Sequence, residues 1–112
     1  MKLTTQMHGD VQIITAEADR IDAASAIAFK DGMRHATEGH DGRVVLDLGQ
    51  VEFIDSSGLG AVVAAMKQMA DTRQLELACL SDGVDRVFRM TRMDTIFPIY
   101  RSINDALTRR VS

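Results

Sequence analysis

The chain has 112 residues, of which 46% are hydrophobic and 26% are charged. This length fits one domain, and the composition is that of a globular protein rather than a disordered chain or a disulfide-rich miniprotein. Thirteen Lys and Arg against sixteen Asp and Glu give a net charge of -3, so we expect neither nucleic acid nor an anionic membrane as a partner.

Location and cofactors are constrained by what the sequence lacks. The first residues have no apolar signal-peptide core, and no apolar run approaches the ~20 residues that span a bilayer, so we expect a cytoplasmic protein without direct membrane insertion. A single cysteine, Cys79, excludes an internal disulfide and agrees with a reducing compartment. Since His8, His35 and His40 show no ligand spacing, we predict no metal site and no cofactor.

The first half of the chain predicts a hairpin, a helix and a buried strand. Residues 3–7 and 11–15 alternate between apolar and polar around Gly9-Asp10, which predicts two antiparallel strands joined by a tight turn. Apolar residues then recur at helical spacing, and Asp22 is the predicted cap of that helix. Residues 44–48 are a short apolar run, typical of a central strand covered on both faces.

The second half predicts three helices and two strands. After a linker at residues 49–54, a helix begins near Leu59 and carries a side of small residues. Residues 74–80 form the next strand, and Asp82 caps a helix. Residues 97–100 predict an edge strand because Pro98 cannot donate to a ladder. Ser102 caps a last helix.

Two strands followed by alternating helices and strands predict an α/β fold with a mixed, largely parallel sheet. In such sheets the loops at the carboxyl ends of the strands carry function. The loop after the central strand contains the most unusual local feature of the chain, the segment 55–60 with the sequence Asp-Ser-Ser-Gly-Leu-Gly.

Two interpretations of segment 55–60 stay open from the residues alone. Ser56 or Ser57 could cap the following helix by accepting a hydrogen bond from a backbone N–H of its first turn, while the glycines permit close packing. Because one serine suffices for a cap, the second hydroxyl could instead be a regulatory target, since a helix N-terminus tolerates a phosphate. The added charge beside Asp55 would then act on binding rather than on folding.

Catalytic interpretations fail residue by residue. A nucleophile elbow needs glycine two positions before its serine, where Asp55 and Ile54 stand instead. Val63 occupies the place of the third glycine of a dinucleotide fingerprint, and no P-loop lysine follows. Ser57 as a nucleophile lacks a positioned base. We therefore expect a protein that is not an enzyme.

Residues 44–48, together with Val51, Phe53, Ile54 and segment 55–60, resemble the signature of the STAS domain, specifically that of bacterial anti-sigma-factor antagonists. The resemblance also covers residues 20–24 before the first helix and residues 84–98 near the end, so residues 1–112 are identified as one STAS domain. It implies a four- to five-stranded sheet flanked by about four helices.

The same resemblance implies partner switching. The unphosphorylated antagonist would bind an anti-sigma factor that is also a serine kinase, phosphorylation of Ser57 would release it, and a serine phosphatase would restore it. The implied partner-binding residues are Asp22, Asp55, Ser56, Ser57, Gly58, Leu59 and Gly60. Asp19-Arg20 stand where the family often has glycine-glutamate, which reverses one charge near this site and leaves partner specificity open.

Other assemblies also use STAS domains. The chain could be an accessory subunit of a phospholipid-transport ABC complex or part of a stress-signalling scaffold. The helix side formed by Gly60, Ala61, Ala64 and Ala65 could seat against a transporter ATPase. A monomer and a homodimer both remain open from the sequence.

Overall fold

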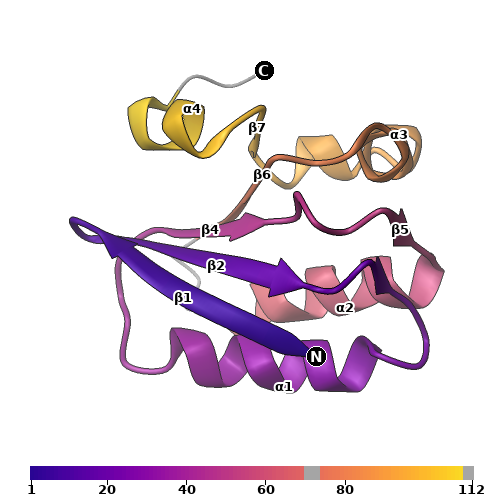
Figure 1. The fold of residues 1–112 in the computed structure, drawn as a ribbon, viewed down its shortest axis with the longest axis horizontal. Coiled ribbons are helices and arrows are strands. Elements are labelled where there is room, and N and C mark those ends of the chain that lie inside the picture. The colour runs from indigo at the N-terminus through magenta and orange to yellow at the C-terminus, as the bar shows by residue number, and fades with distance from the viewer. Residues whose placement is uncertain (70–73, 110–112) are drawn as a thin grey trace.

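The computed structural model describes residues 1–69 and 74–109, so residues 70–73 and 110–112 of the expected domain lie outside the described residues. A five-stranded sheet of order β1-β2-β4-β6-β7 forms its centre (Figure 1). Its strands are β1 (Lys2–His8), β2 (Val11–Glu17), β4 (Val44–Asp47), β6 (Leu75–Ala78) and β7 (Ile99–Tyr100). Only β1 and β2 pair antiparallel, which confirms the predicted α/β fold with a mixed, mostly parallel sheet.

The N-terminal hairpin has the predicted two-residue turn. His8 pairs with Val11, and Gly9 between them has a φ of +62°, a left-handed conformation that costs glycine little. A positive φ at the first turn position alone matches a type II′ turn, which suits the twist of the flanking strands.

Strand β4 lies at the centre of the sheet, as its apolar run predicted. Val44 and Leu46 point into the larger hydrophobic core, whereas Val45, between them, belongs to a second cluster on the opposite face. All three are fully buried, because both faces of this strand are covered.

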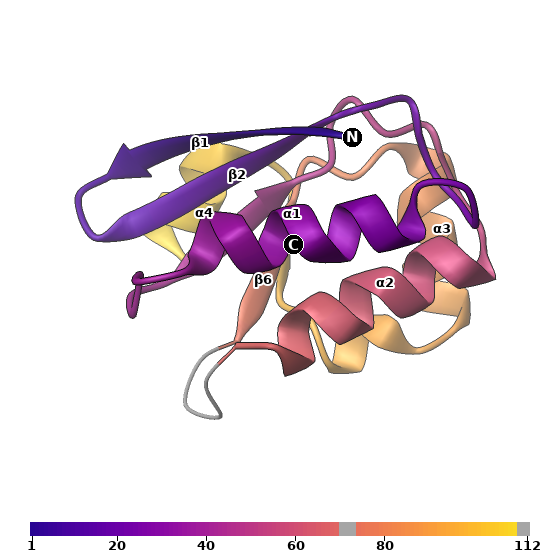
Figure 2. The same ribbon diagram turned by 90° about the horizontal axis from the view of Figure 1, so that it is seen from below.

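Three helices contribute to the larger core on one face of the sheet. They are α1 (Ala26–Thr37), α2 (Ser56–Lys67) and α3 (Asp82–Met90), and Figure 2 shows α1 and α2 side by side across that face. On α2 the small residues Ala61 and Ala65 are buried in this core. They are therefore not available as an outer seat for a transporter ATPase.

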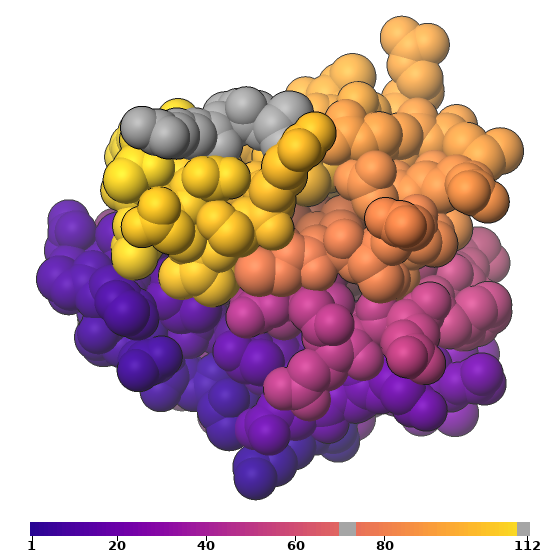
Figure 3. Space-filling model, turned by 45° about the horizontal axis from the view of Figure 1, so that its top comes forward, coloured from indigo at the N-terminus to yellow at the C-terminus, as the bar shows by residue number. Residues whose placement is uncertain are grey.

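The opposite face is covered by the short helix α4 (Ile103–Thr108). Ser102 caps α4 as predicted, because its hydroxyl accepts a hydrogen bond of 3.0 Å from the backbone N–H of Asp105. Ala106 of α4 packs with Val45 and Tyr100 in the second cluster. In Figure 3 the yellow residues of α4 adjoin the orange segment, and indigo residues near the N-terminus lie beside them.

A buried polar network fixes α4 to the sheet. Arg43 donates two hydrogen bonds to the carboxylate of Glu76, of 2.6 and 2.9 Å, and a third to the carbonyl of Ala106. Tyr100 donates a 2.8 Å hydrogen bond to the same carboxylate. Burial opposes ionisation of Glu76, but the hydrogen bonds from Arg43 and Tyr100 outweigh it and lower its pKa.

The structure corrects the prediction that residues 49–54 form only a linker. Strand β5 (Phe53–Ile54) pairs in parallel with β3 (Arg20–Ile21) in a second, two-stranded sheet. Strands of two residues are too short to show a period in the sequence.

Helix α3 begins one residue earlier than its predicted cap implied. Ser81 is the N-cap and Asp82 is the first helical residue. After the short 3-10 helix η1 (Met93–Thr95), the last strand is shorter than predicted, yet β7 lies at the sheet edge as expected. Pro98 precedes it and accepts a hydrogen bond from the backbone N–H of Leu77 through its carbonyl.

Candidate functional site

The candidate site lies where β5 ends and α2 begins. Asp55 has extended backbone and is the N-cap, because its Oδ1 atom accepts a 2.8 Å hydrogen bond from the backbone N–H of Gly58. The interpretation that Ser56 or Ser57 caps this helix is therefore wrong. A carboxylate at this position also interacts favourably with the positive end of the helix dipole.

Ser56 and Ser57 are the first two residues of α2, and both are exposed. Asp55 accepts from the first-turn N–H of Gly58, so this N–H does not need a serine hydroxyl as its partner. The Ser57 residue is therefore open to solvent.

The two glycines of segment 55–60 have different roles. A Cβ atom on Gly58 would collide with the backbone carbonyl of Ile21 in β3 and would lie 2.9 Å from the Cγ1 atom of Ile54. Gly60 is exposed, and a Cβ atom there would meet nothing within 4 Å. Of these two glycines, Gly58 is therefore the one that permits close packing of α2 against the small sheet.

Asp22 lies beside this site but does not cap α1 as predicted. The N-cap of α1 is Ser25. The Oδ1 atom of Asp22 accepts hydrogen bonds from the backbone N–H groups of Ala24 and Ser25, at 3.1 and 3.3 Å, and so closes the turn before the helix.

The turn after β3 and the start of α2 are joined directly. The backbone N–H of Ala23 donates a 3.3 Å hydrogen bond to the Oδ2 atom of Asp55. Asp55 therefore holds both its own helix and the Asp22 turn, which brings two of the predicted partner-binding carboxylates together.

The predicted partner-binding residues differ in their exposure. Ser56, Ser57 and Gly60 are exposed, and Asp22 and Asp55 are half-buried. Gly58 is buried, and half-buried Leu59 packs against the larger core, so these two support the surface from below.

An arginine and an aromatic ring that are not among the predicted partner-binding residues extend this surface. The guanidinium of Arg20 lies 5.1 Å from the ring centroid of Phe53, within the range of a cation–π interaction, and 3.6 Å from Asp22. The Phe53 side chain is 47% exposed, unusually high for its type. Exposed Asp19 and Glu52 lie next to this pair along the chain.

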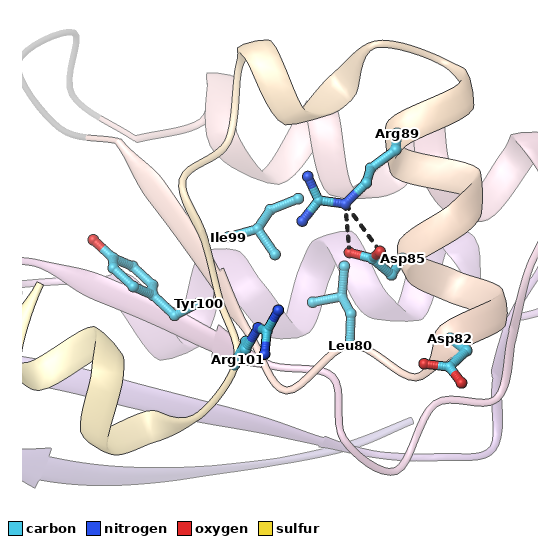
Figure 4. Close-up of a pocket in the computed structure, with 7 residues that line it drawn as sticks. All are labelled: Leu80, Asp82, Asp85, Arg89, Ile99, Tyr100 and Arg101. Carbon is cyan, nitrogen blue, oxygen red and sulfur yellow. Dashed lines mark hydrogen bonds and ion pairs between the residues drawn. The ribbon is translucent and has the colours of Figure 1, made fainter. Parts of the chain in front are cut away.

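A cavity of about 540 Å³ lies between α3 and the carboxyl ends of β6 and β7 (Figure 4). Arg89 donates hydrogen bonds of 2.9 and 3.1 Å to the carboxylate of Asp85, and these raise the pKa of Arg89. Asp94 lies 3.7 Å from the same guanidinium. Asp82 and Arg101 also line this cavity.

Cys79 is a poor nucleophile in this fold. Burial, and then the neighbouring carboxylate of Asp47, raise the pKa of its thiol to about 11. The thiol is therefore protonated at neutral pH, whereas the thiolate is the reactive form. Asp47 organises the following loop, because its Oδ1 atom accepts a 2.8 Å hydrogen bond from the backbone N–H of Gly49.

The described part of the chain offers neither a metal-ligand cluster nor a membrane-spanning helix. Residues 1–69 and 74–109 contain no group of three or more His, Cys, Asp or Glu side chains placed to hold a metal ion. The same residues contain no helix with the length and apolar character needed to cross a bilayer.

Comparison with known proteins identifies the family of this chain. The family model of the STAS domain matches residues 2–106. The anti-sigma-B factor antagonist of Listeria monocytogenes is 36% identical over 85 residues, which cover 73% of each chain.

Solved structures share the fold. An anti-sigma factor antagonist from Mycobacterium paratuberculosis is similar with a TM-score of 0.85 at 24% identity, over 96% of this chain and 92% of that one. The anti-sigma factor antagonist SpoIIAA, in its unphosphorylated form, is similar with a TM-score of 0.71 at 18% identity, over 99% of this chain and all of that one.

The phosphorylated form of Bacillus SpoIIAA is also similar, with a TM-score of 0.66 at 18% identity over 96% of this chain and 98% of that one. The family-model match, the identity to an antagonist and the shared fold agree with one another. The chain therefore belongs to the STAS domain family, and the relatives matched here are anti-sigma-factor antagonists.

Proposed function

We propose that this protein is an anti-sigma-factor antagonist whose partner is a serine-kinase anti-sigma factor. It binds that partner when Ser57 is unmodified, and phosphorylation of Ser57 releases it. The observation that carries the proposal is the exposed Ser57 hydroxyl at the first turn of a helix that Asp55 already caps. A serine phosphatase restores the binding form.

The physical basis of release is charge added without loss of fold. Phosphorylation adds about -1.5 to -2 charge beside Asp55. The positive end of the α2 dipole tolerates the phosphate, and no capping hydrogen bond of Ser57 is lost. The folded state therefore persists, while the surface potential at the docking surface changes sharply.

The proposed docking surface comprises Asp22, Asp55, Ser56, Ser57, Gly58, Leu59 and Gly60. The hydrogen bond from Ala23 to Asp55 supports this grouping, because it holds the Asp22 turn against the start of α2. In this proposal, residues 1–112 form one STAS domain that acts in the cytoplasm and has no catalytic activity. The antagonist relatives and the solved phosphorylated form of SpoIIAA support it.

The first test compares two variants of one position against the anti-sigma-factor kinase encoded nearest to this gene. Ser57→Ala is expected to bind the kinase as tightly as the unmodified protein and to resist release by ATP. Ser57→Asp is expected to bind at least about tenfold more weakly, because it adds charge where the partner docks. Titration calorimetry measures both affinities.

A neighbouring serine provides the matched control. Ser56→Ala keeps the Ser57 hydroxyl, so intact-mass measurement after incubation with kinase and ATP is expected to show one added phosphate, and Ser57→Ala none. Equal affinity of Ser57→Ala and Ser57→Asp for the kinase, or phosphate on Ser57→Ala, contradicts the proposal.

A further inference from the structure

Strand β1 is an open edge of the main sheet. It follows β2 through seven consecutive pairs, from Lys2 opposite Glu17 to His8 opposite Val11, and β2 is its one strand neighbour in the described sheet. Every residue of β1 is exposed except half-buried Leu3. At the other edge β7 has two residues, so β1 presents the longer free edge (Figures 1 and 2).

The usual protections of an edge strand are missing from residues 3–7 of β1. Natural edges carry proline, bulges or charged side chains that oppose pairing with another chain. The seven pairs run without a bulge, and residues 3–7 contain neither proline nor a charged residue. Lys2, at the start of the strand, lies 3.9 Å from Glu17 of the same chain.

The hairpin determines which backbone groups face outward. A two-residue turn is closed by a hydrogen-bonded pair, here His8 and Val11, and such pairs alternate along an antiparallel ladder. The backbone groups of Lys2, Thr4, Gln6 and His8 therefore face β2. Those of Leu3, Thr5 and Met7 face the free edge.

We propose that two copies of this chain form a homodimer by antiparallel pairing of their β1 strands about a two-fold axis at Thr5. Thr5 then lies opposite Thr5 of the second copy, and Leu3 lies opposite Met7 of the second copy. The backbone groups of Leu3, Thr5 and Met7 that face the free edge in one copy therefore lie opposite edge-facing backbone groups of the second copy. In this register apolar residues face apolar ones and polar residues face polar ones, so the edge is self-complementary.

Other registers lose this match. A shift by one residue sets outward-facing backbone groups against inward-facing ones, and a shift by two leaves Met7 or Leu3 without an apolar neighbour. Met7, now 50% exposed, is covered by Leu3 of the second copy in the proposed register. Closed two-fold pairing is the commonest form of homo-oligomer.

The test uses opposite charges at the two-fold position. Thr5→Lys and Thr5→Glu are each expected to weaken dimerisation about fivefold or more, because like charges then lie directly opposite each other. An equimolar mixture of the two variants is expected to restore the dimer. Thr4→Lys is the control, since it lies opposite Gln6 of the second copy and is expected to keep the dimer. Sedimentation equilibrium from micromolar to millimolar concentration measures each, and circular dichroism verifies folding.

A cross-link tests the register. Thr5→Cys is expected to form an intermolecular disulfide on mild oxidation, because each new thiol lies opposite its own copy. Gln6→Cys is the control, since it carries the same native Cys79 but lies opposite Thr4 of the second copy, and it is expected not to cross-link.

Three results would overturn this proposal: a wild-type chain that stays monomeric up to millimolar concentration, a dimer that persists in Thr5→Lys and Thr5→Glu alone, or equal cross-linking of the two cysteine variants. β1 contributes no residue to the docking surface around Ser57. These results therefore leave the kinase-binding proposal unaffected, and failure of the kinase-binding proposal would leave the dimer proposal unaffected.

Discussion

At the scale of single residues, segment 55–60 contains residues that maintain the structure and residues that are exposed for binding. Asp55 caps the helix and holds the Asp22 turn, Gly58 permits close approach to β3, and the two serines face outward. Because structure is maintained by Asp55 and Gly58, the hydroxyl of Ser57 can be modified at little cost to folding.

The division between the glycines predicts opposite effects of one substitution. Gly58→Ala is expected to destabilise the protein by about 3 kcal/mol, because its Cβ atom collides with backbone that cannot move without shifting β3. Gly60→Ala is expected to stabilise it by roughly 0.5–1 kcal/mol, since alanine favours an exposed helical position with open space around it. Urea unfolding of both variants measures the difference, and equal effects would contradict this account.

At the scale of elements, the short helix α4 depends on a buried ion pair. Side chains of Arg43 and Glu76 are 17% and 9% exposed, and together with Tyr100 they join α4 to β6 and β7. Loss of one member leaves the other charge buried without its partner, which is more costly than loss of an exposed pair.

Glu76→Gln is expected to lower the free energy of unfolding at neutral pH by about 3 kcal/mol. The folded-state pKa of Glu76 lies below its ordinary value of 4.5, so its contribution is complete above that value and is lost as pH falls through the folded-state pKa. The difference in free energy of unfolding between wild type and Glu76→Gln should therefore become smaller as the pH falls. Urea unfolding at neutral and acidic pH measures it.

The exposed pair on α3 provides the control for this prediction. Asp85→Asn breaks the ion pair with Arg89, whose side chain is 42% exposed, and little change in stability is expected. A Glu76→Gln variant no less stable than Asp85→Asn would contradict the structural role of the network.

At the scale of the whole molecule, two hydrophobic clusters lie on opposite faces of one sheet. The larger collects residues from α1, α2 and α3, and the smaller lies under α4. Neighbouring residues of β4 contribute to both, as do Leu77 and Ala78 of β6, so the clusters share their strands.

These shared strands predict cooperative unfolding of both layers. Tyr100 is the only tyrosine and the chain has no tryptophan, so tyrosine fluorescence reports on the α4 face alone. Its transition in urea is expected to coincide with that of far-UV circular dichroism, which follows all helices. A fluorescence transition at clearly lower urea concentration would show that the α4 layer detaches separately.

The sequence predicted those elements whose signal lies within a few neighbouring residues. The alternation around Gly9-Asp10 predicted the hairpin, the apolar run 44–48 predicted the central strand, and Ser102 predicted the cap of α4, all of which are confirmed. Segment 55–60 predicted the place of the candidate site and, by resemblance, the family.

Only the tertiary structure decided the contacts between distant segments. Pairing of β3 with β5, and the contrast between buried Gly58 and open Gly60, both depend on which residues meet Ile21 in the folded chain. The physical reason is range: periodicity and capping preference act along a few residues of chain, whereas exposure and close approach are set by residues that meet only after folding.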